Sequence, residues 1–415
     1  MSGHALLSPS GAAAWMACPG KLAMERGLPD IPNDYSDEGT AAHVIAALCL
    51  DKGRAAMSYR GTRVDLGHRT WEVTESMCDY VQDYVDHIHS RITGFRLAGA
   101  RDVTLLVEVR VNFSAFVGQP DSYGTSDAVI IVEWPDGQIQ VDVNDLKYGR
   151  GILVEVDGNP QLLTYALGAY DQFSVLGDIT TISMAIHQPR LNNYSEWSIT
   201  RETLLEFGVR LGEAADVAVA MYNNEIPLVA TPGEEQCRFC KARATCPALH
   251  DYVTGTVAVD FADPQALQVM ETEKLDAMYP SLELVEIWTR GVRAEIERRA
   301  LAGIPFANCK IVQGKRGNRA WRDPAQAEAT LKSMRVRVDE MYETKLISPT
   351  AAERVLADSP KRWERLQALI TQSDGPLSVA PMSDRRPAVF IEPLANEFDG
   401  IEELEAVNNA AAEVT

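Results

Sequence analysis

Two runs of apolar and β-branched residues, joined by a tight turn, constrain the fold of this chain most strongly. GTSDAVIIVEW begins at residue 124, a Pro-Asp-Gly turn follows, and QIQVDVNDLKYG continues the pattern. Such runs around a Pro-Asp-Gly turn are typical of a β-hairpin. Each predicted strand carries an acid, Asp127 near the start of the first and Asp145 near the end of the second. The hairpin therefore predicts two carboxylates on one sheet.

A lysine and an amphipathic helix follow the hairpin. Lys147 lies two positions after Asp145, so both side chains point to one face of the sheet. Gln161 and Tyr165 lie one turn apart on the predicted helix. Carboxylates bind Mg²⁺, the metal acidifies a bound water, and an amine can orient that water or stabilise the developing charge. The alternative is an ion pair between Asp145 and Lys147 at a strand end, with Asp127 as a turn residue.

The order of these motifs resembles the RecB-like branch of the PD-(D/E)XK nucleases. The matching elements are G-T-x-D on one strand, D-x-K-x-G at the end of the next and Q-x-x-x-Y on a helix. The resemblance implies that Asp127 and Asp145 bind Mg²⁺ or Mn²⁺ and that Lys147 is catalytic. It also implies that Gln161 and Tyr165 help to position DNA. One departure is the residue after the lysine, a tyrosine where RecB itself has a threonine.

A histidine on an earlier helix is a candidate third metal ligand. EGTAAHVIAALCL predicts a helix from about Thr40 to Leu50 that carries His43. A lone histidine on an apolar helix is usually a core residue bonded to a backbone carbonyl. However, G-T-x-x-H resembles the first motif of the same nuclease branch, which implies that His43 completes a metal site with Asp127 and Asp145.

A cluster of cysteines predicts a second metal site. Cys237, Cys240 and Cys246 have C-x2-C-x5-C spacing, and the chain shows no export signal. Such clustering in a cytosolic protein indicates metal rather than disulfides. Zinc and iron–sulfur clusters usually take four ligands, and Cys18, in a C-P-G context, is the best candidate for the fourth. The remaining three cysteines are expected to be buried thiols: Cys49, Cys78 and Cys309.

The cysteine pattern also resembles a group of nucleases. A distant N-terminal cysteine with a C-x2-C-x5-C-P group is similar to iron–sulfur nucleases of the RecB-like branch, AddB-like and CRISPR-associated exonucleases among them. The resemblance covers Ser8 to about His250 and implies a 4Fe–4S cluster that joins the ends of the nuclease domain. Structural Zn²⁺ remains the alternative, because spacing alone does not choose the metal. Either metal would close a long loop of the chain.

Further strands complete an α/β core. Strands are predicted at 103–111 and at 180–187, and helices at 70–92 and 201–222. Together with the hairpin they give a mixed sheet flanked by helices, a restriction-endonuclease-like PD-(D/E)XK core. Glu108, the only acid in the first of these strands, could be an extra metal ligand or could point outward, and we expect the second.

Composition divides the chain into three predicted parts. Residues 1–250 form the nuclease domain, 251–371 a mainly helical C-terminal domain and 372–415 a disordered acidic tail. A basic loop around Trp321 suits either contact with a DNA backbone or a solvated surface.

Charge and hydropathy restrict the classes of function. The net charge of −20 over 415 residues argues against a nonspecific coat on nucleic acid, although an enzyme needs only a local positive path. No apolar run approaches the roughly 20 residues that span a bilayer, and no signal peptide is evident. We therefore expect no membrane association and a cytoplasmic location, in the host cell if the protein is phage-encoded.

The sequence thus predicts a metal-dependent deoxyribonuclease, an exonuclease that acts on DNA ends. The architecture resembles phage-encoded proteins of DNA recombination or replication, and that resemblance implies a single-strand-binding or annealing protein as a partner. The alternative is a catalytically inactive nuclease fold that binds DNA or a partner protein. A third hypothesis is an iron–sulfur protein that senses redox state.

Overall fold

The computed structural model describes residues 5–30, 32–261, 272–309 and 364. The chain divides into two compact units, residues 1–311 and residues 312–415. The first unit contains almost all of the described residues and is the one considered below. The basic loop around Trp321, the predicted helical domain beyond residue 309 except residue 364, and the acidic tail lie outside the described residues.

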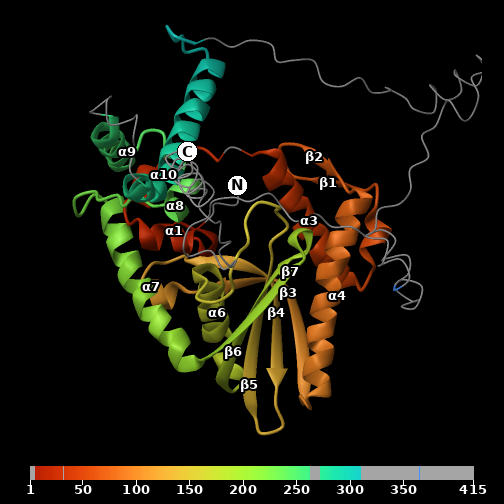
Figure 1. The fold of residues 1–415 in the computed structure, drawn as a ribbon. Helices are drawn as coiled ribbons and strands as arrows, with labels where there is room; N and C mark the ends of the chain where they lie inside the picture. Colours follow the sequence, from red (N-terminus) through yellow and green to blue (C-terminus); the bar gives the residue numbers. More distant parts are fainter. Residues whose placement is uncertain (1–4, 31, 262–271, 310–363, 365–415) are drawn as a thin grey trace, which may run out of the picture. The chain divides into compact units, whose positions relative to one another are not determined.

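A mixed five-stranded sheet forms the centre of the first unit (Figure 1). Its order is β3 (Asp102–Asn112), β4 (Tyr123–Glu133), β5 (Gln138–Leu146), β6 (Asp178–Gln188) and β7 (Asn193–Thr200). β5 and β6 are parallel, and all other neighbours are antiparallel. A parallel pair needs a crossover, and α6 (Pro160–Phe173) supplies it. The predicted mixed α/β fold is confirmed.

The predicted hairpin is the β4–β5 pair. Its turn closes with a hydrogen bond from Gly137 N–H to the Trp134 carbonyl, 3.0 Å, and Gly137 adopts a left-handed φ of 87°. This conformation favours glycine. β7 was not predicted from the sequence; its residues alternate in exposure, as expected for an edge strand.

Helices cover both faces of the sheet and create two cores, as Figure 1 shows. On one face, α1 (Ala12–Ala17), α6 and α7 (Arg201–Tyr222) pack on inward residues such as Val129 and Ile182. On the other face, α3 (Asp34–Lys52) and α4 (Glu75–Leu97) pack on residues such as Ile130. Because both faces are covered, β5 is buried at seven of its nine positions, polar residues included.

Two predicted helix boundaries differ from the structure. The helix expected from residue 70 begins only at Glu75, because Thr74 accepts a hydrogen bond from Met77 N–H as an N-cap. Residues 70–72 instead form β2, which pairs with β1 (Arg63–Asp65). The helix expected from Thr40 begins earlier, at Asp34, because Asn33 and Ser36 form a capping box.

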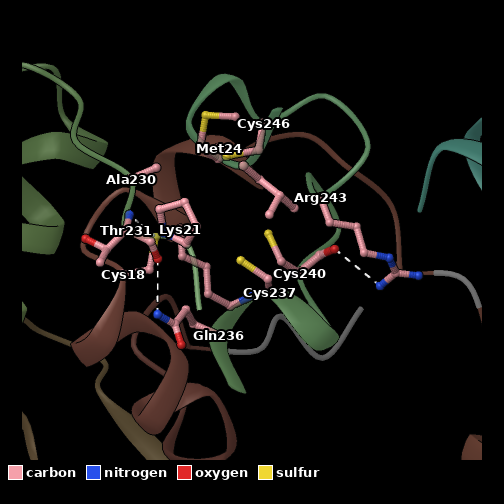
Figure 2. A pocket seen from close by; sticks show the side chains of 12 residues that line it. Cys18, Lys21, Met24, Ala230, Thr231, Gln236, Cys237, Cys240, Arg243 and Cys246 are labelled. Carbon is pink, nitrogen blue, oxygen red and sulfur yellow. Dashed lines mark hydrogen bonds between the residues drawn. The ribbon is translucent and has the colours of Figure 1, made fainter. Parts of the chain in front are cut away.

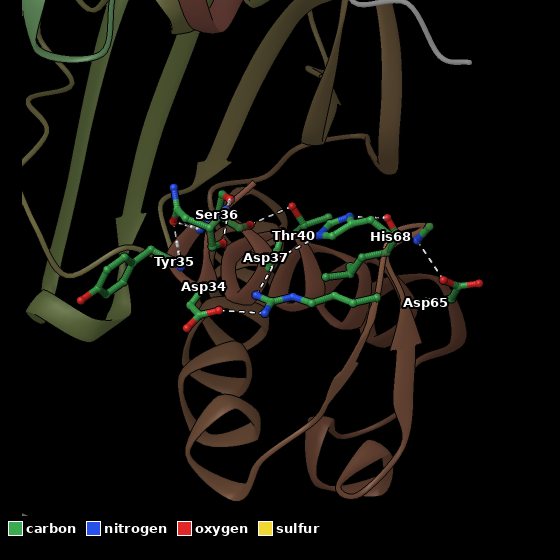
Figure 3. Close-up of polar contacts among 11 residues, drawn as sticks. Asp34, Tyr35, Ser36, Asp37, Thr40, Asp65 and His68 are labelled. Atoms are coloured by element: carbon green, nitrogen blue, oxygen red, sulfur yellow. Dashed lines mark hydrogen bonds and ion pairs between the residues drawn. The ribbon is translucent and has the colours of Figure 1, made fainter. Parts of the chain in front are cut away.

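The β1–β2 hairpin fixes the start of α3. Asp37 is 5% exposed, and its carboxylate pairs with His68 Nε2 at 3.0 Å and with the Arg69 guanidinium (Figure 3). Arg69 also binds Asp34, which lies in the first turn of the helix. A buried carboxylate is costly unless it is paired. These contacts therefore hold the helix that carries His43 in a defined position.

Helices after the sheet form a third, smaller core. α8 (Glu234–Arg238), α9 (Pro247–Phe261) and α10 (Thr272–Leu301) follow the extended segment 226–233. Shorter elements complete the described residues: α2 (Lys21–Met24), α5 (Ser114–Val117), and the 3-10 turns η1 (Pro9–Gly11), η2 (Ala56–Tyr59), η3 (Ser174–Leu176) and η4 (Pro189–Leu191). Among the described residues, no helix is long and apolar enough to cross a membrane.

Candidate active site

Asp127 and Asp145 lie side by side where β4 and β5 end their pairing. The last paired residues are Ala128 and Asn144, so the two acids occupy the next opposed positions. Beyond that point a side-chain contact takes the place of backbone pairing between the strands: Asp127 Oδ2 accepts a hydrogen bond from Leu146 N–H at 2.7 Å. Asp127 is therefore a strand residue and not a turn residue.

The motif glycine before Asp127 has a steric role. A Cβ at Gly124 would lie 2.5 Å from Pro9 Cγ and 2.7 Å from Tyr165 Cε1. Both contacts are shorter than carbon atoms tolerate, so only glycine lets η1 and α6 approach β4 this closely. The first residue of G-T-x-D thus brings Tyr165 to the site.

His43 reaches the same site from α3. Its Nδ1 lies 2.9 Å from Asp127 Oδ1, and its side chain is 34% exposed. Burial alone would lower the pKa of His43, but the charge and hydrogen bond of Asp127, together with the charge of Asp145, raise it to about 9. The imidazole is therefore bonded to a carboxylate at the site, unlike a core histidine bonded to a backbone carbonyl.

Glu108 is a further acid of the site, which the sequence analysis assigned to the outside. One carboxylate oxygen of Glu108 lies within 4.8 Å of the ligand atoms of both His43 and Asp127. Its side chain is exposed, and its place beside His43 and Asp127 suits the alternative role of an extra ligand. Its lone acidic charge in an apolar strand is the same signal that marked Asp127.

The backbone explains this placement of Glu108. Its φ is 51°, a left-handed conformation that is unfavourable for a residue with a Cβ. The residues before and after it pair with β4, Val107 with Ala128 and Val109 with Ser126, but Glu108 itself does not pair. Three neighbouring strands, β3, β4 and β5, therefore each contribute one carboxylate.

Lys147, Gln161 and Tyr165 form a chain of contacts around Asp145. Lys147 Nζ lies 2.9 Å from Asp145 Oδ2 and donates to Gln161 Oε1 at 2.7 Å. Gln161 Nε2 in turn donates to Asp145 Oδ1 at 3.1 Å and to Tyr165 Oη at 3.3 Å. The predicted face shared by Asp145 and Lys147 is confirmed, and the two residues form an ion pair. In this arrangement Asp145 is turned toward Lys147.

The charges of the site fit a bound divalent cation. Burial and the neighbouring Asp127 charge raise the pKa of Asp145, which Lys147 partly offsets. The same two causes raise the pKa of Glu108. A cation between the carboxylates would remove this repulsion. One imidazole and carboxylate oxygens suit Mn²⁺ or Mg²⁺. His43, Glu108 and Asp127 would be its ligands, with Asp145 on the adjacent strand.

The four predicted cysteines line one cavity, although Cys18 is far in sequence from the other three. Cys18 follows α1, Cys237 lies in α8, and Cys240 and Cys246 lie before α9. All four line a cavity of about 20 Å³ (Figure 2). Cys18, Cys237 and Cys246 are buried, and among the described residues no cysteine forms a disulfide.

The surroundings of these thiols suit a thiolate-bound metal. Thr231 N–H donates to Cys18 Sγ at 3.3 Å, and Gly233 N–H donates to Cys237 Sγ at 3.5 Å. Burial raises the pKa of Cys240 to about 12 and also raises that of Cys237. Buried thiols with such pKa values stay neutral unless a cation stabilises the thiolates. The donor set fits four-thiolate coordination of iron–sulfur or zinc.

The other three cysteines divide between core and surface. Cys49 and Cys78 are fully buried in the core under α3 and α4, as predicted. Cys309 is exposed, so the expectation of a buried thiol is wrong there. It follows the end of α10, where the described residues stop.

Comparison with known protein families shows which family the chain belongs to. The family described as "Protein of unknown function (DUF2800)" matches residues 4–387. The chain belongs to the DUF2800 family. Among solved structures, this DUF2800 protein is similar to a protein from Eubacterium rectale described as "Putative exonuclease". The two share 12% identity over 53% of this chain and 82% of that chain, with a TM-score of 0.32. The function proposed below therefore rests on the side chains of the site.

Proposed function

We propose that this DUF2800 protein is a metal-dependent DNA nuclease of the RecB-like PD-(D/E)XK type. The observation that carries the proposal is the convergence of Glu108, Asp127 and Asp145 from three adjacent strands, with His43 beside them. A lysine paired to the third acid completes the set. This combination of residues suits hydrolysis of a phosphodiester at a divalent cation.

Different residues of the site would have different roles in such a reaction. His43, Glu108 and Asp127 would hold the cation, which when bound acidifies water and neutralises charge on the scissile phosphate. Lys147 stands at Asp145 with its ammonium fixed by Gln161, so it can stabilise negative charge that develops on the phosphate. Tyr165 accepts a hydrogen bond from Gln161 and so restricts that amide to one orientation.

The cysteine cluster is proposed as a structural 4Fe–4S site, with zinc as the alternative. It joins the segment after α1 to the segment around α8, at the two ends of the sheet domain in sequence. The metal is identified by its content in the purified protein and by visible absorbance. A brown protein that contains iron supports the cluster, and a colourless one that contains zinc supports the alternative.

The finer parts of the proposal rest on the order of the motifs. Action on DNA ends, and a role in phage recombination or replication beside a single-strand-binding or annealing protein, follow from the resemblance to RecB-like exonucleases. Linear and circular DNA distinguish the first point, because an exonuclease degrades only the linear form.

The deciding experiment incubates the purified full-length protein with both DNA forms, in Mn²⁺ or in EDTA. Asp145→Ala and Lys147→Ala serve as variants. We expect cleavage of linear DNA in Mn²⁺ by the wild type alone. Cleavage in EDTA, or equal cleavage by the variants, would remove the proposal. DNA binding without cleavage would instead favour the catalytically inactive alternative.

A further inference from the structure

The segment between the catalytic lysine and α6 is a closed loop. It leaves β5 at Lys147 and returns to Gln161, and these two side chains are bonded at 2.7 Å. A compact loop with adjacent ends is an Ω-loop, a type that is frequently functional. The two ends of the loop are therefore held together at the site.

The middle of the loop is also fixed. Gln188, at the end of β6, is 2% exposed. Its Oε1 accepts a hydrogen bond from Val154 N–H at 2.9 Å, and its Nε2 donates to the Ile152 carbonyl at 2.8 Å. Asn193 Nδ2 donates to the same Oε1 at 2.9 Å. The side-chain amide holds the loop backbone at two points, as a neighbouring strand would.

The fixed loop presents Arg150 and two aliphatic side chains to solvent, and it also exposes Glu155 and Asp157 nearer to α6. Ile152 is 44% exposed and Leu153 is 55% exposed, whereas Val154 and Val156 pack against the core. Arg150 is exposed, and within the described part of the chain it has no ion pair. Single exposed aliphatics are ordinary, but an adjacent pair on a fixed backbone beside a cation and a catalytic lysine is a specific surface.

We propose that Arg150, Ile152 and Leu153 form a contact surface for the end of a DNA strand. It deepens the proposed function and rests on it. Arg150 binds a backbone phosphate next to the scissile one, since an unpaired guanidinium favours phosphate. Ile152 and Leu153 pack on the terminal base once it leaves the stack, as apolar side chains do where they separate bases.

The test measures binding in the Asp127→Asn background, where cleavage is strongly reduced and the Lys147–Gln161 hydrogen bond that closes the loop is kept, with Mn²⁺ present. The probe is a short duplex with 2-aminopurine at one end, because its fluorescence rises when the base unstacks. The control variant changes a second exposed aliphatic pair, Val175 and Leu176, to serine. That pair lies beyond the far end of α6, about 20 Å along the helix axis from Gln161.

We expect the full-length parent to raise the fluorescence on binding. Changing Ile152 and Leu153 to serine should abolish most of that rise, whereas the control keeps it. Arg150→Ala should weaken binding roughly fivefold at low salt and reduce the salt slope by about one.

Two results overturn the inference. In the first, both variants behave like the control. In the second, changing Ile152 and Leu153 to serine lowers the melting temperature but leaves the fluorescence rise unchanged. The second result would mean that another part of this chain covers the pair. The proposed function fails separately if the wild type neither binds nor cuts DNA. If the wild type cuts DNA while both variants bind it like the control, only this inference is removed.

Discussion

The two candidate metal sites are built in opposite ways. At the end of the sheet, strand register and α3 bring charged side chains together, and these already bond to each other: His43 to Asp127, and Lys147 to Asp145. At the cysteine cluster, neutral thiols from distant segments surround a small cavity, with few polar contacts between them. Polar contacts between side chains hold the first site, whereas the second is held, in our proposal, by a metal bound to the four thiols.

The two sites should therefore differ in whether substitutions affect activity or the stability of the fold. Changes at the sheet site should remove activity and leave the fold intact. Changes at the cysteines should weaken the fold, because the apolar core there is small and consists of Cys237, Cys246, Leu249, Val253, Leu284 and Ile287. The predictions that follow test this separation, beginning with the largest effect.

Asp127→Asn should reduce Mn²⁺-dependent DNA cleavage by roughly a thousandfold. The substitution removes a ligand charge and the partner of His43, while the new side-chain oxygen still accepts Leu146 N–H. The melting temperature should therefore change little. Initial rates on linear DNA and differential scanning calorimetry give the two quantities. A large loss of stability would show that the site is part of the scaffold, against the comparison above.

Cys18→Ser should lower the melting temperature by roughly 10 °C and remove the bound metal. Cys18 is the one proposed ligand of the cluster from the N-terminal segment, so its loss would release that segment from α8. Calorimetry and metal analysis measure both effects. Cys309→Ser, at an exposed thiol, is the matched control and should change neither. A variant that keeps its metal and its melting temperature would contradict the structural role.

Glu108→Gln should weaken Mn²⁺ binding by about tenfold, because it removes one charged ligand. Without metal, the same variant should be slightly more stable than the wild type, since the carboxylate repulsion with Asp127 is relieved. Calorimetric titration with Mn²⁺ measures the affinity. Asp102→Asn, exposed at the start of the same strand, is the control. Equal Mn²⁺ affinities in the two variants would place Glu108 outside the metal site.

A buried histidine of β6, on the face of the sheet that α4 covers, should make stability depend on pH. His187 is 1% exposed, packs against Tyr84 and has its Nε2 3.0 Å from Asn144 Oδ1. Burial, with the nearby His87 and Arg91 charges, lowers the pKa of His187 to about 3 from 6.5. In the unfolded chain His187 takes up a proton near pH 6.5, whereas in the folded chain it does so only near pH 3. Stability present above pH 6.5 is therefore lost as pH falls through this window, by on the order of 1 kcal/mol per pH unit.

Chemical denaturation of the wild type and of His187→Gln across that pH window measures this effect. The variant should lose less stability than the wild type on acidification. Parallel curves for the two proteins would show that His187 is protonated in the fold.

The sequence was sufficient for the parts of the site that lie close together along the chain. Periodicity and turn residues predicted the hairpin, and the two-residue spacing placed Asp145 and Lys147 on one face. The G-T-x-D glycine was a marker in the sequence, and its steric cause, the approach of Pro9 and Tyr165, became visible only in the fold.

Glu108 and the β1–β2 hairpin show what the sequence could not supply. Alternation along β3 does not reveal a residue with a φ of 51°, because the irregular backbone depends on the packing of neighbouring strands. Nor does it show that β1–β2 anchors α3, since the Asp37 contacts with His68 and Arg69 join residues far apart in sequence. Long-range pairing of this kind is fixed by tertiary structure.

The most direct test of the central claim compares the wild type with Lys147→Ala on linear DNA while Mn²⁺ binding is measured on the same preparations. Lys147 contacts Asp145 and Gln161 and lies outside the His43, Glu108 and Asp127 ligand set. We predict nearly equal Mn²⁺ affinities and a loss of cleavage of roughly a hundredfold to a thousandfold in the variant. Cleavage at the wild-type rate by Lys147→Ala would contradict the account.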